Sequence, residues 1–251
     1  MRTRRLLAAS AALLTLALST PAAATPAEPP PSAQPAALES PFQDWFTAIP
    51  LTVNGTYTPL VGFSECGPDL GWFWVLWYAP GTAADSLWVF DGESADALEP
   101  TSRPLTVNGT FTPVTGDFDD DGCVDVLWYA PGSASDSIWW GEPDGSFTAE
   151  PLTINGTYTP VVGRFAPTLD ACWCTDVFWY STTGGTEHIW LGSPDRTFTS
   201  AVAPQVTRRD YRVSADWEGS LLFHGPGAAP DHVWRGVTAG STTPAQSLPI
   251  T

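Results

Sequence analysis

Short runs of apolar residues, bounded by Gly, Pro, Asn and Asp, recur along the chain from residue 42 onward. No segment after residue 41 has apolar positions at the 3.6-residue spacing of a helix. One unit predicts four strands, at 112–118, 123–130, 137–141 and 147–154. The second is nearly all apolar, as is typical of a strand covered on both faces, whereas the third and fourth alternate. The pattern therefore predicts an all-β fold.

Four copies of this unit align along the chain. The segment after the buried strand reads Trp77-Tyr-Ala-Pro-Gly81, Trp128-Tyr-Ala-Pro-Gly132, Trp179-Tyr-Ser-Thr-Thr183 and Phe223-His-Gly-Pro-Gly227. These copies are 51, 51 and 44 residues apart. A period of about 40–50 residues with four short strands is typical of a β-propeller blade. We therefore predict that residues 42–251 form a β-propeller of about four blades, each with four antiparallel strands.

A ring of four such blades can be closed in two ways. A blade cannot bury its own faces, so neighbouring blades must stack. An additional strand at about 45–53 would close the ring by pairing in the last blade. Alternatively, a second chain completes the ring, which makes a homodimer an open alternative. The Asn-Gly pairs at 54–55, 108–109 and 155–156 supply the positive-φ residues of tight turns.

The N-terminus has the features of a targeting segment. Arg2, Arg4 and Arg5 precede an apolar run at 6–18 and a small-residue cleavage site at 22–24, so residues 1–24 are predicted to be a signal peptide. The apolar run is shorter than the roughly 20 residues that span a membrane, and we expect no membrane span. Residues 25–41 are dominated by Pro and Ala and are predicted to be a disordered tether. We expect a secreted or cell-surface protein.

The chain is strongly acidic. Its formal net charge is −17, and removal of residues 1–24 would leave seven basic against 27 acidic residues, with no Lys. Such a surface repels phosphate backbones, which argues against nucleic-acid binding. It is compatible with divalent cations.

One loop has the spacing of a cation site. Asp117, Asp119, Asp121 and Asp125 stand at positions 1, 3, 5 and 9 of the loop, and Gly122 stands at position 6. This spacing turns alternate carboxylates toward one point, and the backbone carbonyl of Cys123 adds a further oxygen. Several hard oxygen ligands favour Ca²⁺ over Mg²⁺. The Glu that ends an EF-hand loop is absent, because position 12 is Trp128, inside the predicted buried strand.

The segment 116–127 resembles the FG-GAP/VCBS repeats of secreted bacterial proteins, which are related to the integrin α-chain propeller. The resemblance covers about residues 42–251, and only the second unit keeps the motif intact. It implies Ca²⁺ bound by Asp117, Asp119, Asp121, Asp125 and the Cys123 carbonyl, with the ion bracing the blade. It implies no partner or activity, because propellers serve many roles. The matching loops of the other units lack most of the carboxylates, so we expect one metal site.

All four cysteines, Cys66, Cys123, Cys172 and Cys174, fall in the loops equivalent to the metal loop. In an exported protein they predict two disulfide bonds, with three possible connectivities. A bridge between Cys172 and Cys174 would be strained at that spacing, which favours pairing between loops of different blades. We hypothesise that disulfides replace ions where carboxylates are missing.

The sequence contains no nucleophile elbow, zinc-protease motif, phosphate loop or Rossmann fingerprint. The leading interpretation is a non-enzymatic, calcium-braced binding or adhesion module with a protein or glycan ligand. A lectin is one alternative, because six tryptophans are not explained by the repeats: Trp45, Trp72, Trp74, Trp140, Trp173 and Trp217. The other alternative is a polysaccharide-degrading enzyme that uses Asp or Glu in a propeller cleft. The three histidines occupy repeat positions, which favours structural roles.

Overall fold

The computed structural model describes residues 52–66, 72–90, 100–132, 135–166, 172–243 and 246–250. The chain divides into two compact units, 1–53 and 54–251, and nearly all described residues belong to the second. The predicted signal peptide, the tether and most of the additional strand at 45–53 lie outside the described residues.

The described part of the chain contains sixteen strands and no helix. The first sheet consists of β1 (Thr58–Ser64), β2 (Trp72–Tyr78), β3 (Asp85–Phe90) and β4 (Thr101–Leu105). The second consists of β5 (Thr112–Gly116), β6 (Asp125–Tyr129), β7 (Asp136–Gly141) and β8 (Phe147–Leu152). The third consists of β9 (Tyr158–Gly163), β10 (Asp176–Ser181), β11 (His188–Ser193) and β12 (Thr197–Val202). The fourth consists of β13 (Arg212–Ala215), β14 (Leu221–His224), β15 (Asp231–Arg235) and β16 (Gln246–Ile250).

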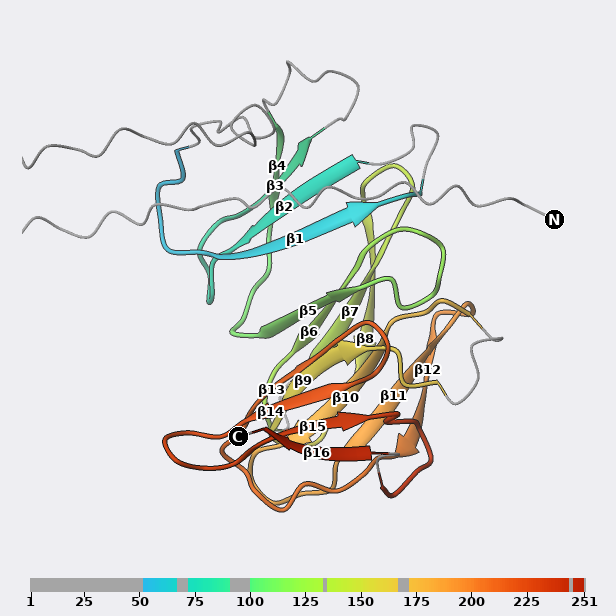
Figure 1. The fold of residues 1–251 in the computed structure, drawn as a ribbon. Helices are drawn as coiled ribbons and strands as arrows, with labels where there is room; N and C mark the ends of the chain where they lie inside the picture. The colour runs from blue at the N-terminus through green and yellow to red at the C-terminus, as the bar shows by residue number, and fades with distance from the viewer. Residues whose placement is uncertain are drawn as a thin grey trace, which may run out of the picture. The chain divides into compact units, whose positions relative to one another are not determined.

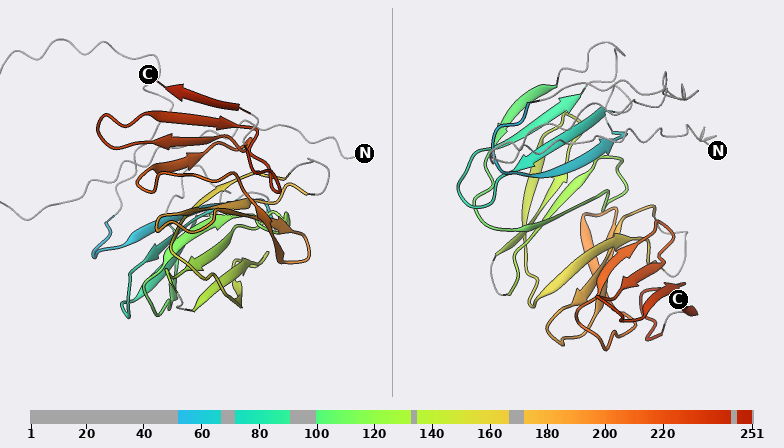
Figure 2. Two further views of the ribbon diagram at one scale, coloured as in Figure 1. Left: turned by 90° about the horizontal axis from the view of Figure 1, so that it is seen from below. Right: turned by 60° about the vertical axis from the view of Figure 1, so that its left-hand side comes forward.

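Each sheet is an antiparallel meander whose strands pair in chain order (Figure 1). The four meanders are separate sheets, and Figure 2 shows them from two further directions. The first strands of successive sheets are neighbours, because β1 contacts β5, β5 contacts β9, and β9 contacts β13. No comparable contact joins β13 to β1 within the described ranges. The predicted all-β class, with repeated four-stranded antiparallel units, is thus confirmed.

Three separate hydrophobic cores lie between consecutive sheets. Strand β6 shows how one strand serves two of them, since all five of its residues are buried. Its alternate side chains Val126 and Trp128 pack with residues of the first sheet, whereas Leu127 and Tyr129 pack with residues of the third. Successive side chains of a strand point to opposite faces, so a continuous apolar run is what a doubly covered strand requires.

A buried aromatic pair recurs at each junction between sheets. The ring of Tyr78 lies 5.0 Å from that of Trp128, and Tyr129 lies 5.3 Å from Trp179, both edge to face. The hydroxyl groups of Tyr78 and Tyr129 also fix the segment that leads to the next sheet. Tyr78 donates to the carbonyl of Gly109 and accepts from the backbone N–H of Phe111. At these junctions the tyrosine ring packs in the core, and its buried hydroxyl group is hydrogen-bonded to the backbone.

Buried carboxylates fix the same linker segments. Asp136 accepts hydrogen bonds from the backbone N–H groups of Ala130 and Ile154, at 2.8 and 2.7 Å. Asp85 does the same for Ala79 and Val107 in the first unit. Both aspartates begin a repeated segment, Asp85-Ser-Leu-Trp88 and Asp136-Ser-Ile-Trp139, and their role is structural.

Details of the strand prediction also agree with the structure. The four strands predicted in the second unit lie within about two residues of β5, β6, β7 and β8, as is usual for boundaries. Gly109 and Gly156 of the Asn-Gly pairs have positive φ values, 142° and 137°, as predicted. They lie in isolated bridges with Gly81 and Gly132, however, and not in the tight turns that the sequence predicted. Among the described residues, no helix is long and apolar enough to cross a membrane.

Candidate cation site in the β5–β6 loop

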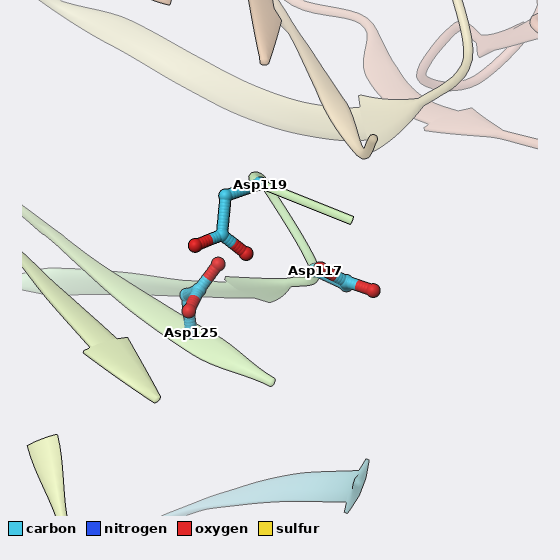
Figure 3. A group of neighbouring side chains, drawn as sticks. All are labelled: Asp117, Asp119 and Asp125. Carbon is cyan, nitrogen blue, oxygen red and sulfur yellow. The ribbon is translucent and has the colours of Figure 1, made fainter. Parts of the chain in front are cut away.

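The loop between β5 and β6 brings three carboxylates together. Asp117, Asp119 and Asp125 each place one oxygen within 4.8 Å of the others (Figure 3). Asp117 directly follows β5, and Asp125 is the first residue of β6. The chain turns between them through positive φ at Asp120 (59°) and Gly122 (86°). Gly122 therefore has the conformation that only glycine adopts readily, at the position where the sequence predicted a sharp turn.

Asp125 is fully buried, and backbone groups hold both of its oxygens. Its Oδ2 accepts from Phe118 N–H and its Oδ1 from Gly141 N–H, each at 2.8 Å. Asp176 forms the same pair of bonds, to Phe165 and Gly192, in the third unit. Because the third unit lacks the carboxylate series, this position has a structural role that is independent of any ion. Burial raises the pKa of Asp125 to about 8, against the lowering effect of the two N–H donors.

Asp117 has one oxygen without a partner. Its Oδ2 accepts from Gly122 N–H at 3.1 Å, whereas its Oδ1 is buried and forms no hydrogen bond. Burial raises the pKa of Asp117 to about 7, and the neighbouring carboxylates of Asp119, Asp120 and Asp121 add to this shift. A buried oxygen with unused lone pairs, in an excess of negative charge, is the environment that a bound cation would complete.

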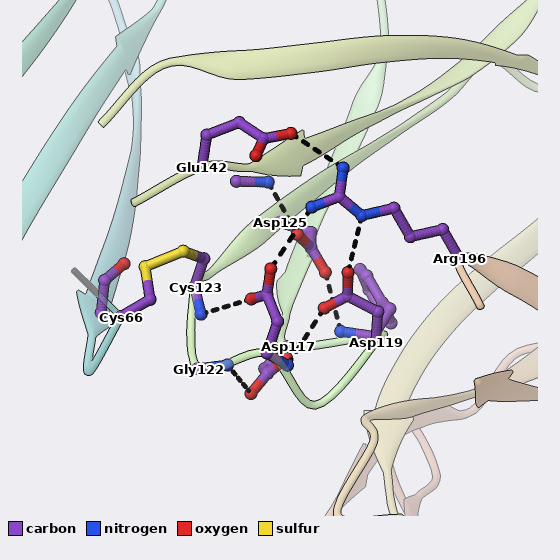
Figure 4. A network of polar contacts seen from close by, with 12 residues as sticks. Cys66, Asp117, Asp119, Gly122, Cys123, Asp125, Glu142 and Arg196 are labelled. Carbon is purple, nitrogen blue, oxygen red and sulfur yellow. Dashed lines mark hydrogen bonds and ion pairs between the residues drawn. A yellow bond between two sulfur atoms is a disulfide. The ribbon is translucent and has the colours of Figure 1, made fainter. Parts of the chain in front are cut away.

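Asp119 and Asp121 share a cationic partner from another sheet (Figure 4). Arg196, in the turn between β11 and β12, donates from Nε to Asp119 Oδ2 at 2.9 Å and from Nη2 to Asp121 Oδ2 at 3.3 Å. Its Nη1 also donates to Glu142 Oε1 at 2.8 Å. Arg196 has a φ of 61°, which is uncommon for a residue other than glycine. Asp121 faces this guanidinium and lies outside the group of three carboxylates.

Arg196 is the residue that the sequence analysis missed. It stands in an Asp-Arg-Thr segment between two strands, where a polar residue is ordinary and predicts only a turn. Its partners lie more than 50 residues away in the chain. The sequence offered one indication of its role. Acidic residues far outnumber basic ones, so each arginine of the folded domain is expected to pair with carboxylates.

The fifth predicted ligand residue, Cys123, forms a disulfide bond with Cys66. This bond joins the acidic loop of the second unit to the equivalent loop of the first, so a pairing between loops of different units, as expected, is present (Figure 4). The second disulfide links Cys172 to Cys174, with Cα atoms 5.2 Å apart, so the expectation that this direct bridge would be avoided was wrong. The bridge forms because the backbone conformation at Trp173 places the two Cα atoms within the usual range of a disulfide bond.

Backbone hydrogen bonds connect the loop to the sheets on both sides. Toward the first sheet, Glu65 N–H donates to the Gly122 carbonyl at 2.8 Å, and Val124 N–H donates to Ser64 Oγ. Toward the third, Thr175 N–H donates to the Asp117 carbonyl at 2.6 Å. The acidic loop therefore connects three sheets, and its conformation affects more than its own unit.

The equivalent loops of the other units have no comparable arrangement in the part of the chain that the structure describes. In the fourth unit, Asp216 accepts from the backbone N–H groups of Glu218 and Ser220, which closes an ordinary polar turn. Comparison of the chain with family models, with curated proteins and with solved structures finds no match.

Proposed function

We propose that the chain is an exported β-propeller module, of the kind that FG-GAP/VCBS repeats form, that binds another molecule at or outside the cell surface. In this proposal the β5–β6 loop binds one Ca²⁺ ion, which stabilises the module. In the same proposal the surface that binds the other molecule is separate from the ion. No catalytic group is assigned.

The convergence of Asp117, Asp119 and Asp125, with the buried Oδ1 of Asp117 unpartnered, is the observation that carries the Ca²⁺ proposal. Like charges about 4 Å apart repel by roughly 4 kcal/mol at an effective dielectric of 20. The described cluster also contains Asp121 and Glu142 but only one cationic partner, Arg196. A divalent cation would offset the remaining negative charge.

The donor set fits Ca²⁺ by its chemistry. Carboxylate oxygens are hard ligands, and the predicted set adds Asp121 and the carbonyl of Cys123 to the three convergent carboxylates. Hard oxygen ligands without a converging thiolate or imidazole disfavour Zn²⁺. Both described disulfides leave Cys66, Cys123, Cys172 and Cys174 without a free thiol.

The sheet arrangement supports a propeller. Four consecutive antiparallel meanders, with the first strand of each beside the first strand of the next, have the topology of consecutive blades. The two disulfide bonds support an oxidising environment, which agrees with export.

Thermal unfolding of the mature chain in EDTA and in Ca²⁺ tests the proposal. Ca²⁺ should raise the Tm of the wild type by several degrees, since a ligand at 100 times its Kd stabilises by about 2.7 kcal/mol. Asp117→Asn should abolish this gain. Asp216→Asn, in the equivalent loop of the fourth unit, is the matched control and should retain it. A wild-type Tm that is the same in EDTA and Ca²⁺ would rule the ion out.

A further inference from the structure

Two tryptophans on the surface come from different sheets and meet at the same arginine. The chain contains 13 tryptophans, and among those whose side chains the structure describes only Trp173 and Trp217 are exposed, by 48% and 55%. Trp173 precedes β10 of the third sheet, and Trp217 lies in the turn between β13 and β14 of the fourth. The guanidinium carbon of Arg164 lies 4.1 Å from the ring centre of Trp173 and 6.0 Å from that of Trp217.

Trp173 is held in place although it is exposed. The disulfide bond between Cys172 and Cys174 closes the chain immediately on both sides of it. Its backbone N–H donates to Asp120 Oδ2 at 3.0 Å, and Arg164 Nη2 donates to the carbonyl of Cys172 at 3.1 Å. The covalent ring and the two hydrogen bonds fix the backbone at Trp173, and the Arg164 guanidinium lies against its ring. A segment ordered before binding loses less conformational entropy when it binds a ligand.

The buried Arg164 contributes the guanidinium that lies near both indoles. Only 8% of its surface is exposed. It forms no direct ion pair with a described carboxylate, although its charge acts on the buried carboxylate of Asp176. A guanidinium has five N–H donors in a fixed plane, and one of them is used in the bond to Cys172. The cation lies within the range of both rings over which cation–π attraction acts, which orients the indoles. Its unused donors remain available to an oxygen-rich ligand.

We propose that Trp173, Trp217 and Arg164 form a binding site for uncharged polysaccharides. The inference rests on the proposed function as a binding module and names its ligand class. A pyranose ring has an apolar C–H face that stacks on an indole, and a rim of hydroxyl oxygens that accept from a guanidinium. One such ligand would contact the guanidinium of Arg164 and the rings of Trp173 and Trp217 together.

The negative charge around the site favours uncharged polysaccharides over polyanionic ones. Asp120 contacts the backbone of Trp173, and Asp216 and Glu218 flank Trp217. Together with the net charge of −17, these carboxylates repel polyanionic glycans and anionic membrane surfaces at long range. A ligand with neutral hydroxyl groups meets no such repulsion.

The test uses the mature chain with both disulfide bonds intact. The probes are hexasaccharides of β-1,4-glucose, β-1,4-N-acetylglucosamine, β-1,4-xylose and β-1,3-glucose, with polygalacturonate as the polyanion. Binding is measured by calorimetry and by the change in tryptophan fluorescence. At least one neutral probe should bind, and Trp173→Ala and Trp217→Ala should each weaken it by about 10-fold or more. Phe63→Ala, which removes an exposed aromatic ring on β1, should leave the affinity unchanged.

Three results would overturn the inference. They are the absence of binding to every neutral probe, binding that both tryptophan variants retain, and preference for polygalacturonate. The gain in Tm with Ca²⁺, measured on the same three variants, separates this inference from the proposed function. If that gain persists while no glycan binds, the ligand class is wrong and the ion site stands. If the gain is absent, the proposed role of the ion is wrong regardless of the glycan result.

Discussion

Arg196 and Asp119 are 77 residues apart in the chain, yet Nε of the arginine donates to Oδ2 of the aspartate at 2.9 Å. The aspartate side chain is 3% exposed and the arginine 31% exposed. This pair links the third sheet to the acidic loop of the second, and it gives the loop a permanent internal cation. Any divalent ion in the loop would therefore be bound in the presence of this guanidinium, and the two would share the carboxylate of Asp119.

Arg196→Ala should lower the stability of the ion-free protein and enlarge the stabilisation by Ca²⁺. The variant loses three ion pairs, one to a buried carboxylate, at a cost of roughly 1–2 kcal/mol. It also leaves more uncompensated negative charge for the ion to neutralise. Denaturant unfolding with EDTA and with Ca²⁺ measures both effects. Arg208→Ala, whose partner Asp210 is exposed, is the control and should leave the stability close to that of the wild type. A smaller Ca²⁺ effect in Arg196→Ala would contradict the shared-carboxylate interpretation.

The stability of the ion-free protein should fall as the pH rises from about 4 to about 8. The pKa values of Asp117 and Asp125 are raised from 3.8 to about 7 and about 8, mainly by burial. Between these values the folded chain binds protons that the unfolded chain has already lost, so the free energy of unfolding decreases with pH. Protons compete with a cation for the same oxygens, so the stabilisation by Ca²⁺ should grow over the same interval.

Thermal unfolding between pH 5 and pH 8.5, in EDTA and in Ca²⁺, checks this dependence. The two series of Tm values should diverge as the pH rises. Parallel series would show that the carboxylates of the loop do not exchange protons for the ion.

The two disulfide bonds should contribute unequally to stability. The bond between Cys66 and Cys123 spans 57 residues, for which the loop-entropy relation gives about 4 kcal/mol. The bond between Cys172 and Cys174 spans two residues, for which the same relation gives about 1.5 kcal/mol or less. Double Cys→Ser variants of each pair, compared by denaturant unfolding, measure the two contributions. An equal loss in both would show that strain or residual structure outweighs chain entropy.

Asp136→Ala should destabilise the protein without affecting the ion site. The variant leaves two buried backbone N–H groups, of Ala130 and Ile154, without their acceptor, which costs roughly 2–4 kcal/mol. Asp144→Ala, in an exposed turn, is the control and should leave the stability close to that of the wild type. The Ca²⁺ affinity of both variants should equal that of the wild type. Loss of Ca²⁺ binding in folded Asp136→Ala would mean that this aspartate is more than a structural acceptor.

Much of the fold could be predicted from the sequence because the physics of each unit is local and repeated. The apolar run at 126–129 matches a strand buried on both faces, and the Trp-Tyr pair within it supplies one side chain to each neighbouring core. The four copies of this pattern along the chain predicted the number of sheets. The contact between first strands is a consequence of stacking units that cannot bury their own faces.

The candidate site was less predictable because its partners are distant. The spacing of Asp117, Asp119 and Asp125 predicted that carboxylates converge, and they do. The same spacing included Asp121, but Arg196 from another sheet faces this residue, and no local pattern encodes that contact. Similarly, no pattern in the Cys-Trp-Cys segment encodes the backbone conformation that brings Cys172 and Cys174 to bridging distance, or the contacts of Trp173 with Arg164 and Asp120.

Calorimetric titration of the EDTA-treated mature chain with Ca²⁺ tests the central proposal most directly. We predict one ion per chain for the wild type, and affinity weaker by about 10-fold or more for Asp117→Asn and for Asp119→Asn. Asp216→Asn should bind as the wild type does. A wild-type chain that binds no Ca²⁺, or folded Asp117→Asn and Asp119→Asn variants that bind it as tightly as the wild type, would contradict the assignment of the β5–β6 loop as the cation site.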